Sequence, residues 1–126
     1  MTEESEKSQE PLIRADRIKH SFIEGESSVQ ALRGISFEAR TSEITAIVGQ
    51  SGCGKSTLLY LLGLLDRPES GEIYFQGRPM ALASNEERTT LRNESIGFVF
   101  QFHFLIKELT ARENVALPLR KSGVGE

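Results

Sequence analysis

The sequence predicts an α/β protein in which strands and helices alternate around a glycine-rich loop. Three neighbouring features support this prediction. Ile44–Val48 is compatible with burial on both faces, which is typical of a central parallel strand. Three glycines, Gly49, Gly52 and Gly54, follow it directly. Ser56–Leu65 is then nearly all leucine, which predicts a helix that is buried on most sides, between layers of sheet.

The segment before the loop predicts strands and a tail. Met1–Pro11 is polar and acidic, with almost nothing to bury, and is expected to be a disordered tail. Leu12–Ile18 is expected to form a first strand. Ser21–Gln30 contains Gly25 and suits a loop or hairpin turn. Apolar and polar residues alternate over Ile35–Ala39, which predicts a half-buried strand.

The segment after the loop predicts further strands and helices. Glu72–Gln76 and Ile96–Phe100 are expected to be short strands, and Gln76–Gly77 a turn. Two capping boxes place Ser or Thr three residues before Glu: Ser84 with Glu87, and Thr110 with Glu113. The first predicts a helix to about Asn93 and the second a helix toward Leu117.

Composition excludes several classes of function. The 126 residues carry a formal net charge of −3, which provides no field to attract nucleic acid. The single cysteine, Cys53, excludes an internal disulfide and a zinc cluster. The longest apolar stretch, Leu58–Leu65, is far shorter than the roughly 20 residues of a membrane span. Since Met1–Glu10 also lacks the features of a signal peptide, we expect a cytoplasmic protein.

The glycine-rich loop matches the phosphate-binding pattern G-x-x-x-x-G-K-[ST]. The candidate nucleotide-binding residues are Gly49, Gln50, Ser51, Gly52, Cys53, Gly54, Lys55, Ser56 and Thr57. Glycine tolerates the dihedral angles that aim successive backbone N–H groups at phosphate oxygens. The start of the following helix adds unpaired N–H groups and the positive end of its dipole. The loop therefore predicts the binding of a polyphosphate such as that of ATP.

Two side chains of the loop extend this prediction. Lys55 is expected to reach the β- and γ-phosphates, and the Ser56 hydroxyl to hold Mg²⁺. The glycines do not fit the dinucleotide pattern G-x-G-x-x-G, which has no need of the Lys-Ser pair. The structural alternative is a strand–helix turn without a ligand.

Four stretches resemble motifs of ABC-transporter ATP-binding subunits, in family order and spacing: Ser51–Leu59, Arg67–Ile73, Ile96–Gln101 and Thr110–Val115. They look like the Walker A, the P-x-S-G-x-I turn, the strand into the Q-loop and the T-x-x-E-N-V helix start. The resemblance covers Leu12 to about Arg120, and Leu61–Asp66 and Gln101–His103 are most similar to lipoprotein-releasing and related exporters. Ser42 departs from the pattern, because a glycine is common there, and Lys107 replaces a common proline.

The resemblance implies roles for two further residues. Phe22 matches the aromatic residue that stacks on adenine, although a strand-end core residue is the alternative. Gln101 matches the Q-loop glutamine, which senses Mg²⁺ and the γ-phosphate and links to the membrane partner; the alternative is a polar strand end. Catalytic roles are thus expected for Lys55 and Gln101, and metal contacts for Ser56 and Gln101.

The resemblance also implies a fold and an activity. The expected fold is a P-loop NTPase with a RecA-like core and an N-terminal antiparallel β-subdomain, ending after the start of the helical subdomain. Residues 12–126 are then a partial ATPase domain. The family implies a homodimer with transmembrane permease subunits, which couples ATP hydrolysis to export or lipoprotein release on the cytoplasmic face of the inner membrane.

These 126 residues contain neither the signature LSGGQ nor a Walker B strand ending in Asp-Glu. Hydrolysis needs a group that orients the attacking water. We therefore expect this chain alone to bind nucleotide without turning it over. A truncated nucleotide-binding remnant is the alternative to a transport ATPase, and another P-loop enzyme such as a kinase is a third possibility.

Overall fold

The computed structural model describes residues 10–121, which belong to two compact units that divide between Ser84 and Asn85. Of the predicted tail, residues 1–9 lie outside the described residues. Glu10 and Pro11 precede the first strand without regular structure. No helix in the part of the chain that is described has the length and hydrophobicity needed to cross a bilayer.

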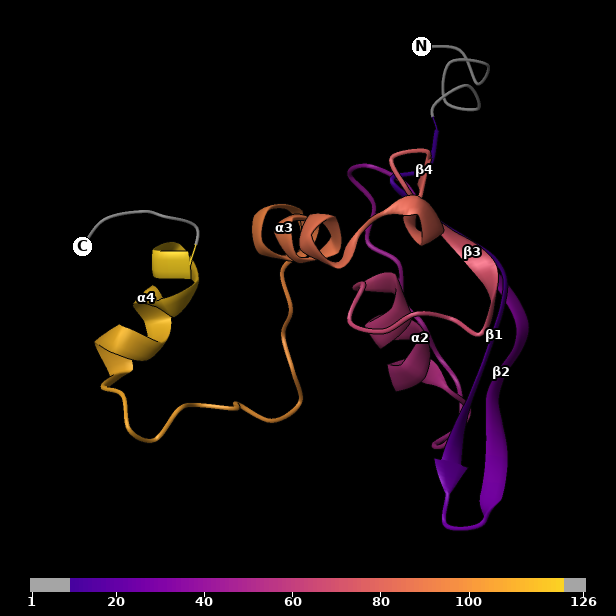
Figure 1. Ribbon diagram of the computed structural model, residues 1–126, viewed down its shortest axis with the longest axis horizontal. Helices are drawn as coiled ribbons and strands as arrows, with labels where there is room; N and C mark the ends of the chain where they lie inside the picture. The colour runs from indigo at the N-terminus through magenta and orange to yellow at the C-terminus, as the bar shows by residue number, and fades with distance from the viewer. Residues whose placement is uncertain (1–9, 122–126) are drawn as a thin grey trace. The chain divides into compact units, whose positions relative to one another are not determined.

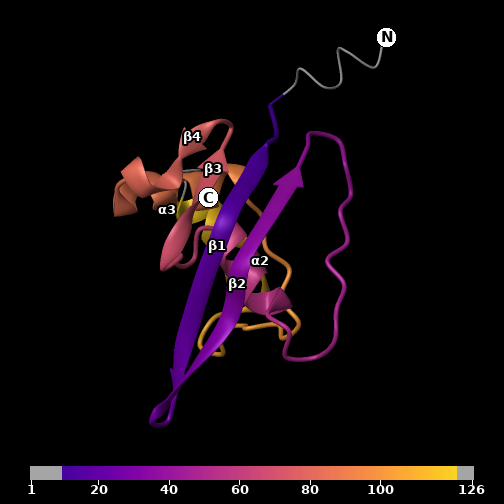
Figure 2. The same cartoon turned by 90° about the vertical axis from the view of Figure 1, so that its right-hand side faces the viewer.

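The first unit contains a four-stranded sheet with the order β2-β1-β3-β4 (Figures 1 and 2). Its strands are β1, Ile13–Glu24; β2, Ser27–Ala39; β3, Ser70–Phe75; and β4, Arg78–Pro79. Every neighbouring pair is antiparallel. This sheet agrees with the expected antiparallel β-subdomain.

The hairpin of β1 and β2 is longer than the sequence predicts. The loop or hairpin turn expected within Ser21–Gln30 is a hairpin turn, and it is shorter than that range, because only Gly25 and Glu26 lie outside the strands. Phe22 pairs with Val29 in the antiparallel register. Gly25 adopts a φ of 65°, which allows the tight turn. Backbone pairing therefore outweighs the polar side chains, which remain exposed along this part of the hairpin.

The helix α2, Lys55–Leu62, follows the glycine-rich loop and lies beside the β1–β2 hairpin (Figures 1 and 2). It ends at Gly63, earlier than predicted. Leu58, Leu61 and Leu62 are buried, whereas Leu59 is 53% exposed. The expectation of burial on most sides is therefore wrong in this unit, because only the side of the helix that faces the sheet is covered.

Two predicted strands are absent from the described residues. Ile44–Val48 and Ile96–Phe100 pair with no other segment within residues 10–121. Ile44 and Val48 are fully or nearly fully exposed, and Val99 is too. An extended apolar segment becomes a strand only where a neighbour supplies backbone hydrogen bonds. The prediction of a central parallel strand is thus wrong for this structure.

The starts of α3 and α4 agree with the two predicted capping boxes, whereas η1 was not predicted. The 3₁₀ helix η1, Met80–Leu82, closes the first unit, and α3, Asn85–Ser95, begins immediately after Ser84. In the second unit, α4 covers Ala111–Lys121. The amide of Thr110 donates to Glu113 Oε2 at 2.9 Å, and the amide of Glu113 donates to Thr110 Oγ1 at 3.1 Å. The second capping box is therefore formed in full.

Candidate functional site

A pocket of about 420 Å³ lies between the glycine-rich loop and the β1–β2 hairpin. Its residues from the loop and α2 are Ser51, Gly52, Gly54, Lys55, Ser56 and Thr57, and those from the hairpin are Phe22, Val29, Gln30 and Ala31. All of them belong to the first unit. Most of the predicted nucleotide-binding residues therefore meet at one cavity.

Gly54 sets the approach of the loop to the sheet. It is the N-cap of α2 and adopts a left-handed conformation with a φ of 98°. A β-carbon at this position would lie 2.6 Å from the backbone oxygen of Ala31 and 3.0 Å from Leu32 Cδ2. Only glycine satisfies both the backbone angle and this contact with β2.

Lys55 directs its ammonium group into the loop. Nζ donates hydrogen bonds to the backbone oxygens of Gly49 and Gln50, the latter at 2.8 Å. It also lies 3.6 Å from Cys53 Sγ. The loop therefore curves around a positive charge, which favours the binding of an anion in the adjoining pocket.

The first turn of α2 reinforces this electrostatic preference. The amide of Leu58 donates to the Gly54 oxygen at 2.9 Å, which is the first bond of the helix. The amides before it have no acceptor within the helix. No acidic residue lies in the first turn. Ser56 and Thr57 thus present a helix N-terminus and two hydroxyl groups to the pocket.

Phe22 lies on the other wall of the pocket, near the end of β1. Its side chain is 46% exposed, so its ring is not a core residue. The structural alternative that the sequence left open is therefore wrong for Phe22. An exposed ring beside a phosphate-binding loop can stack on a planar base.

Gln101 belongs to the second unit, while the pocket is built from the first unit alone. It is exposed and lies in the irregular segment between α3 and α4, not at the end of a strand. The neighbouring rings contact one another: Phe100 and Phe104 have centroids 5.2 Å apart in an edge-to-face arrangement. The geometry of the first unit brings the loop and Phe22 together, and the role of Gln101 stays a prediction.

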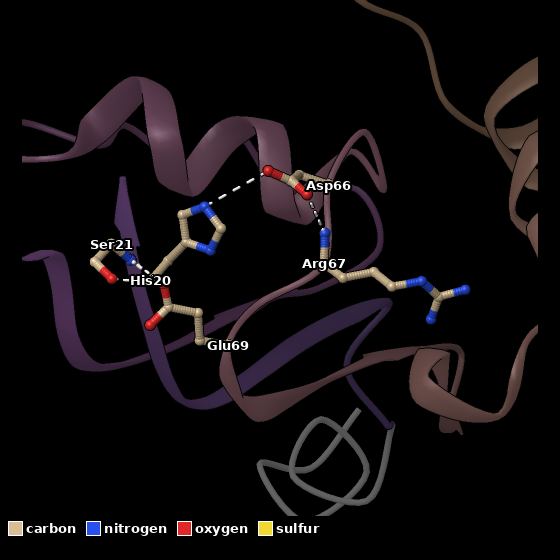
Figure 3. A network of polar contacts seen from close by, with 5 residues as sticks. All are labelled: His20, Ser21, Asp66, Arg67 and Glu69. Carbon is tan, nitrogen blue, oxygen red and sulfur yellow. Dashed lines mark hydrogen bonds and ion pairs between the residues drawn. The ribbon is translucent and has the colours of Figure 1, made fainter. Parts of the chain in front are cut away.

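Sequence reasoning missed two groups of residues around the pocket. Val29, Gln30 and Ala31 line it from β2, yet most of this stretch was assigned to a loop. Ser27 to Gln30 are all exposed, so no alternation of buried and exposed residues marked them as a strand. The second group comprises residues of β1 and of the segment after α2 that form polar contacts with one another (Figure 3). These residues lie about 48 positions apart in the sequence, so no local pattern joins them.

Glu69 forms the best-defined of these contacts. Its Oε1 accepts hydrogen bonds from the Ser21 amide at 3.0 Å and from Ser21 Oγ at 2.5 Å. The hydrogen bond from the Ser21 hydroxyl, and after it the bond from the Ser21 amide, lower the pKa of the Glu69 carboxyl because both stabilise its charged form. Glu69 is thus held as a carboxylate beside the strand that carries Phe22.

The sequence is similar to proteins that act in lipoprotein release. One relative, the lipoprotein-releasing system ATP-binding protein LolD of Xanthomonas campestris pv. campestris (strain 8004), is 51% identical over 112 residues, which are 89% of this chain and 47% of the relative. LolD of Bdellovibrio bacteriovorus is 47% identical over 111 residues, covering 88% of this chain and 50% of the relative. The chain spans about half the length of the curated relatives it matches.

Solved structures agree on the fold. A dimeric structure of MJ0796, a bacterial ABC transporter cassette, has a TM-score of 0.82 and 38% identity, and the match covers 90% of this chain and 49% of that one. The same cassette in a post-hydrolysis state, bound to ADP and Pi, has a TM-score of 0.82 and 37% identity, with the same coverage. The predicted fold class, a P-loop ATPase domain with an antiparallel β-subdomain, is therefore confirmed.

The family assignment rests on the region that contains the phosphate-loop wall of the pocket. Residues 32–124 match the profile of the family described as ABC transporter. This match begins in β2, includes the whole glycine-rich loop and extends through α4. From the geometry of the loop and this match together, we conclude that the chain belongs to the ABC transporter family, as its ATP-binding part.

Proposed function

We propose that the pocket between the glycine-rich loop and Phe22 binds MgATP. The observation that carries the proposal is a cavity of about 420 Å³ that the phosphate loop and an exposed aromatic ring both line. One wall supplies backbone amides and an ammonium group for the triphosphate, and the other supplies a ring for the base. The ADP and Pi bound to the cassette MJ0796 support a nucleotide as the ligand.

At the phosphate end, each proposed role follows from a position in the loop. The amides of the first turn of α2 donate to phosphate oxygens. Gly54, which has no side chain, allows the end of the loop to lie against β2. The Lys55 ammonium exchanges its bonds with the Gly49 and Gln50 oxygens for bonds to the β- and γ-phosphates. This exchange replaces neutral acceptors with charged ones, so it favours the bound state.

Mg²⁺ is the proposed companion of the triphosphate. Within residues 10–121, no group of three or more His, Cys, Asp or Glu side chains is arranged to hold a metal ion. A hydroxyl with phosphate oxygens and water is the usual arrangement for Mg²⁺ in such sites. Ser56 is the proposed ligand in the pocket. Gln101 is proposed as the second protein ligand and as a catalytic residue with Lys55.

For the whole protein, we propose an ATP-binding component of a transporter that couples ATP hydrolysis to lipoprotein release or export. The names of the relatives in Xanthomonas and Bdellovibrio support lipoprotein release. The dimeric cassette MJ0796 supports a homodimer of ATPase domains. The cbiO1 protein of Clostridium perfringens, at 29% identity and a TM-score of 0.56, is part of the ABC transporter complex cbiONQ, which supports assembly into a complex with permease subunits. We propose the cytoplasmic face of the inner membrane as the place of that assembly.

The second candidate function is nucleotide binding without hydrolysis. It is favoured by the sequence itself, because these 126 residues hold neither an LSGGQ motif nor a Walker B strand. Lys55 and Ser56 position a triphosphate, but a group that orients the attacking water is still required. We therefore propose that the 126-residue chain alone binds MgATP and does not turn it over.

Calorimetric titration of the chain with MgATP tests the binding proposal, and release of inorganic phosphate tests the second. We expect saturable heat from the parent chain, clearly weaker binding by Lys55→Ala, and no phosphate release from either. An absence of heat with the folded parent chain would overturn the proposed site. Phosphate release that disappears in Lys55→Ala would overturn the proposal that the chain alone is inactive.

A further inference from the structure

We infer that Glu69 is a positioning residue for nucleotide binding: it holds the part of β1 that carries Phe22 against the segment that leaves α2. The inference rests on the proposed binding of ATP in the same pocket. The segments on either side of the short helix α2 each determine one half of the ligand site. The phosphate loop precedes the helix, and the segment that follows it sets the wall for the base.

Glu69 forms hydrogen bonds with the two residues that flank His20 in β1, Lys19 and Ser21. Its backbone amide donates to the Lys19 oxygen at 3.0 Å. Its carboxylate accepts from the amide of Ser21 at 3.0 Å and from the Ser21 hydroxyl. The next residue, Ser70, pairs with Lys19 in the sheet. The hydrogen bonds of Glu69 therefore extend the pairing of β3 with β1 by one step. At this step the carboxylate side chain, not the backbone, accepts from β1, at the residue before Phe22.

A second contact joins the same two segments. His20 Nε2 lies 3.5 Å from Asp66 Oδ2, and the His20 side chain is only 15% exposed (Figure 3). The amide of Arg67 donates to the other Asp66 oxygen at 2.8 Å, which orients the carboxylate. We call the contacts of Asp66 and Glu69 with Lys19, His20 and Ser21 the β1 tether.

The His20–Asp66 contact of the β1 tether lies at a cavity that Phe22 also lines. His20, Asp66, Tyr60 and Phe22 line a cavity of about 160 Å³, which also includes Thr57 of the phosphate loop. Phe22 and Thr57 line the nucleotide pocket as well. The two cavities thus share one wall, so a displacement of β1 at Ser21 shifts the ring relative to the first turn of α2.

This geometry makes a prediction that a general loss of stability does not. Inorganic tripolyphosphate uses the loop, Lys55 and Ser56 but has no base to stack on Phe22. ATP uses both walls. A change that loosens the β1 tether should therefore weaken ATP and leave tripolyphosphate unaffected, whereas unfolding would weaken both.

The test is calorimetric titration of the 126-residue chain with MgATP and, separately, with magnesium tripolyphosphate. We expect Glu69→Ala to raise the Kd for MgATP about tenfold, as the loss of hydrogen bonds to a charged group implies. The Kd for tripolyphosphate should change less than about twofold. Ser21→Ala should weaken MgATP to a smaller extent. Glu69→Gln should restore most of the affinity, because its amide oxygen accepts the same two bonds.

Phe22→Ala and Glu38→Ala serve as the two controls. Phe22→Ala removes the stacking ring and should reproduce the separation between the two ligands. Glu38→Ala breaks a pair with Arg40 elsewhere in the sheet, at 3.2 Å, and should change neither Kd. Equal weakening of both ligands by Glu69→Ala, or no weakening of MgATP, would overturn the inference. If the folded parent chain binds neither ligand, the proposed function fails instead, so the two failures are distinct.

Discussion

A β-carbon on Gly54 would come within 2.6 Å of the Ala31 carbonyl oxygen, so the start of α2 and the edge strand β2 are in contact through their backbones. The packing of the first unit and the shape of the nucleotide pocket therefore depend on the same glycine. Ala31 and Gly54 both line that pocket. A change at either position affects stability and binding together.

We expect Gly54→Ala to destabilise the chain by more than about 2 kcal/mol and to abolish MgATP binding, because a side chain meets both a positive φ and a backbone clash. Gly52→Ala is the matched control. Gly52 has a φ of 81°, but no atom lies within 4 Å of its β-carbon position. It should cost only the backbone strain, about 1–2 kcal/mol. Urea denaturation measures both, and equal losses would contradict the proposed role of the contact with Ala31.

Lys55→Ala should weaken both MgATP and tripolyphosphate at least about tenfold, because it removes a charge-assisted contact worth about 1.5–3 kcal/mol. The free energy of unfolding should change little, since the bonds to the Gly49 and Gln50 oxygens link residues within one exposed loop. Lys107→Ala removes a positive charge from the second unit and controls for net charge. A Lys55→Ala chain that binds tripolyphosphate normally would contradict the role of the ammonium group.

The contact of Glu69 with Ser21 predicts a pH dependence of stability. The pKa of the folded Glu69 carboxyl lies below its ordinary value of 4.5, chiefly because the Ser21 hydroxyl donates to it. The carboxylate therefore stabilises the fold above pH 4.5, and this contribution is lost as the pH falls below that value and through the folded pKa.

Thermal denaturation from pH 7 downward checks this sign. The midpoint difference between the parent chain and Glu69→Gln should be constant near neutral pH and shrink below the ordinary pKa of 4.5. Because the group is exposed, we expect the difference to decrease at high salt. A difference that grows on acidification would show that Glu69 gains stability on protonation, which is opposite to the prediction.

Ser42 has a positive φ of 63°, in the left-handed region that favours glycine. A residue with a β-carbon is strained there by about 1 kcal/mol. Replacing Ser42 with glycine removes this strain, but part of the gain in stability is offset by the greater conformational freedom of glycine in the unfolded chain. We expect Ser42→Gly to stabilise the chain by about 0.5 kcal/mol in urea denaturation. Ser42→Ala keeps the β-carbon and should bring no gain.

Asn114 organises the segment before α4 in the second unit. Its Oδ1 accepts from the Ile106 amide at 2.9 Å, while Nδ2 donates to the oxygens of Ile106, Leu109 and Thr110. Asn114→Asp keeps the acceptor and loses the donors, so it should raise amide hydrogen exchange at Leu109, whose amide is bonded to the Ile106 oxygen. Asn93→Asp in α3 is the control. Unchanged exchange at Leu109 would contradict this role of the amide group.

The sequence determined the local chemistry of the candidate site. The spacing of Gly49, Gly54 and Lys55 predicts a phosphate loop that opens a helix, and α2 begins at Lys55, one residue before the predicted range. The pairing of Thr110 with Glu113 predicted the start of α4, and both hydrogen bonds are present. These features depend on residues a few positions apart, so their physical cause is contained in a short segment of sequence.

Tertiary structure alone decided the contacts between distant segments. Ile44–Val48 has the composition of a buried strand, yet it lies exposed because no segment of residues 10–121 pairs with it. Conversely, Ser21 looked like part of a loop, and it became a strand residue because β2 and Glu69 supply partners for its backbone. Hydrogen-bond partners and burial come from the neighbours that the folded chain provides, so composition along one segment predicts what it can form, and the packing decides what it does form.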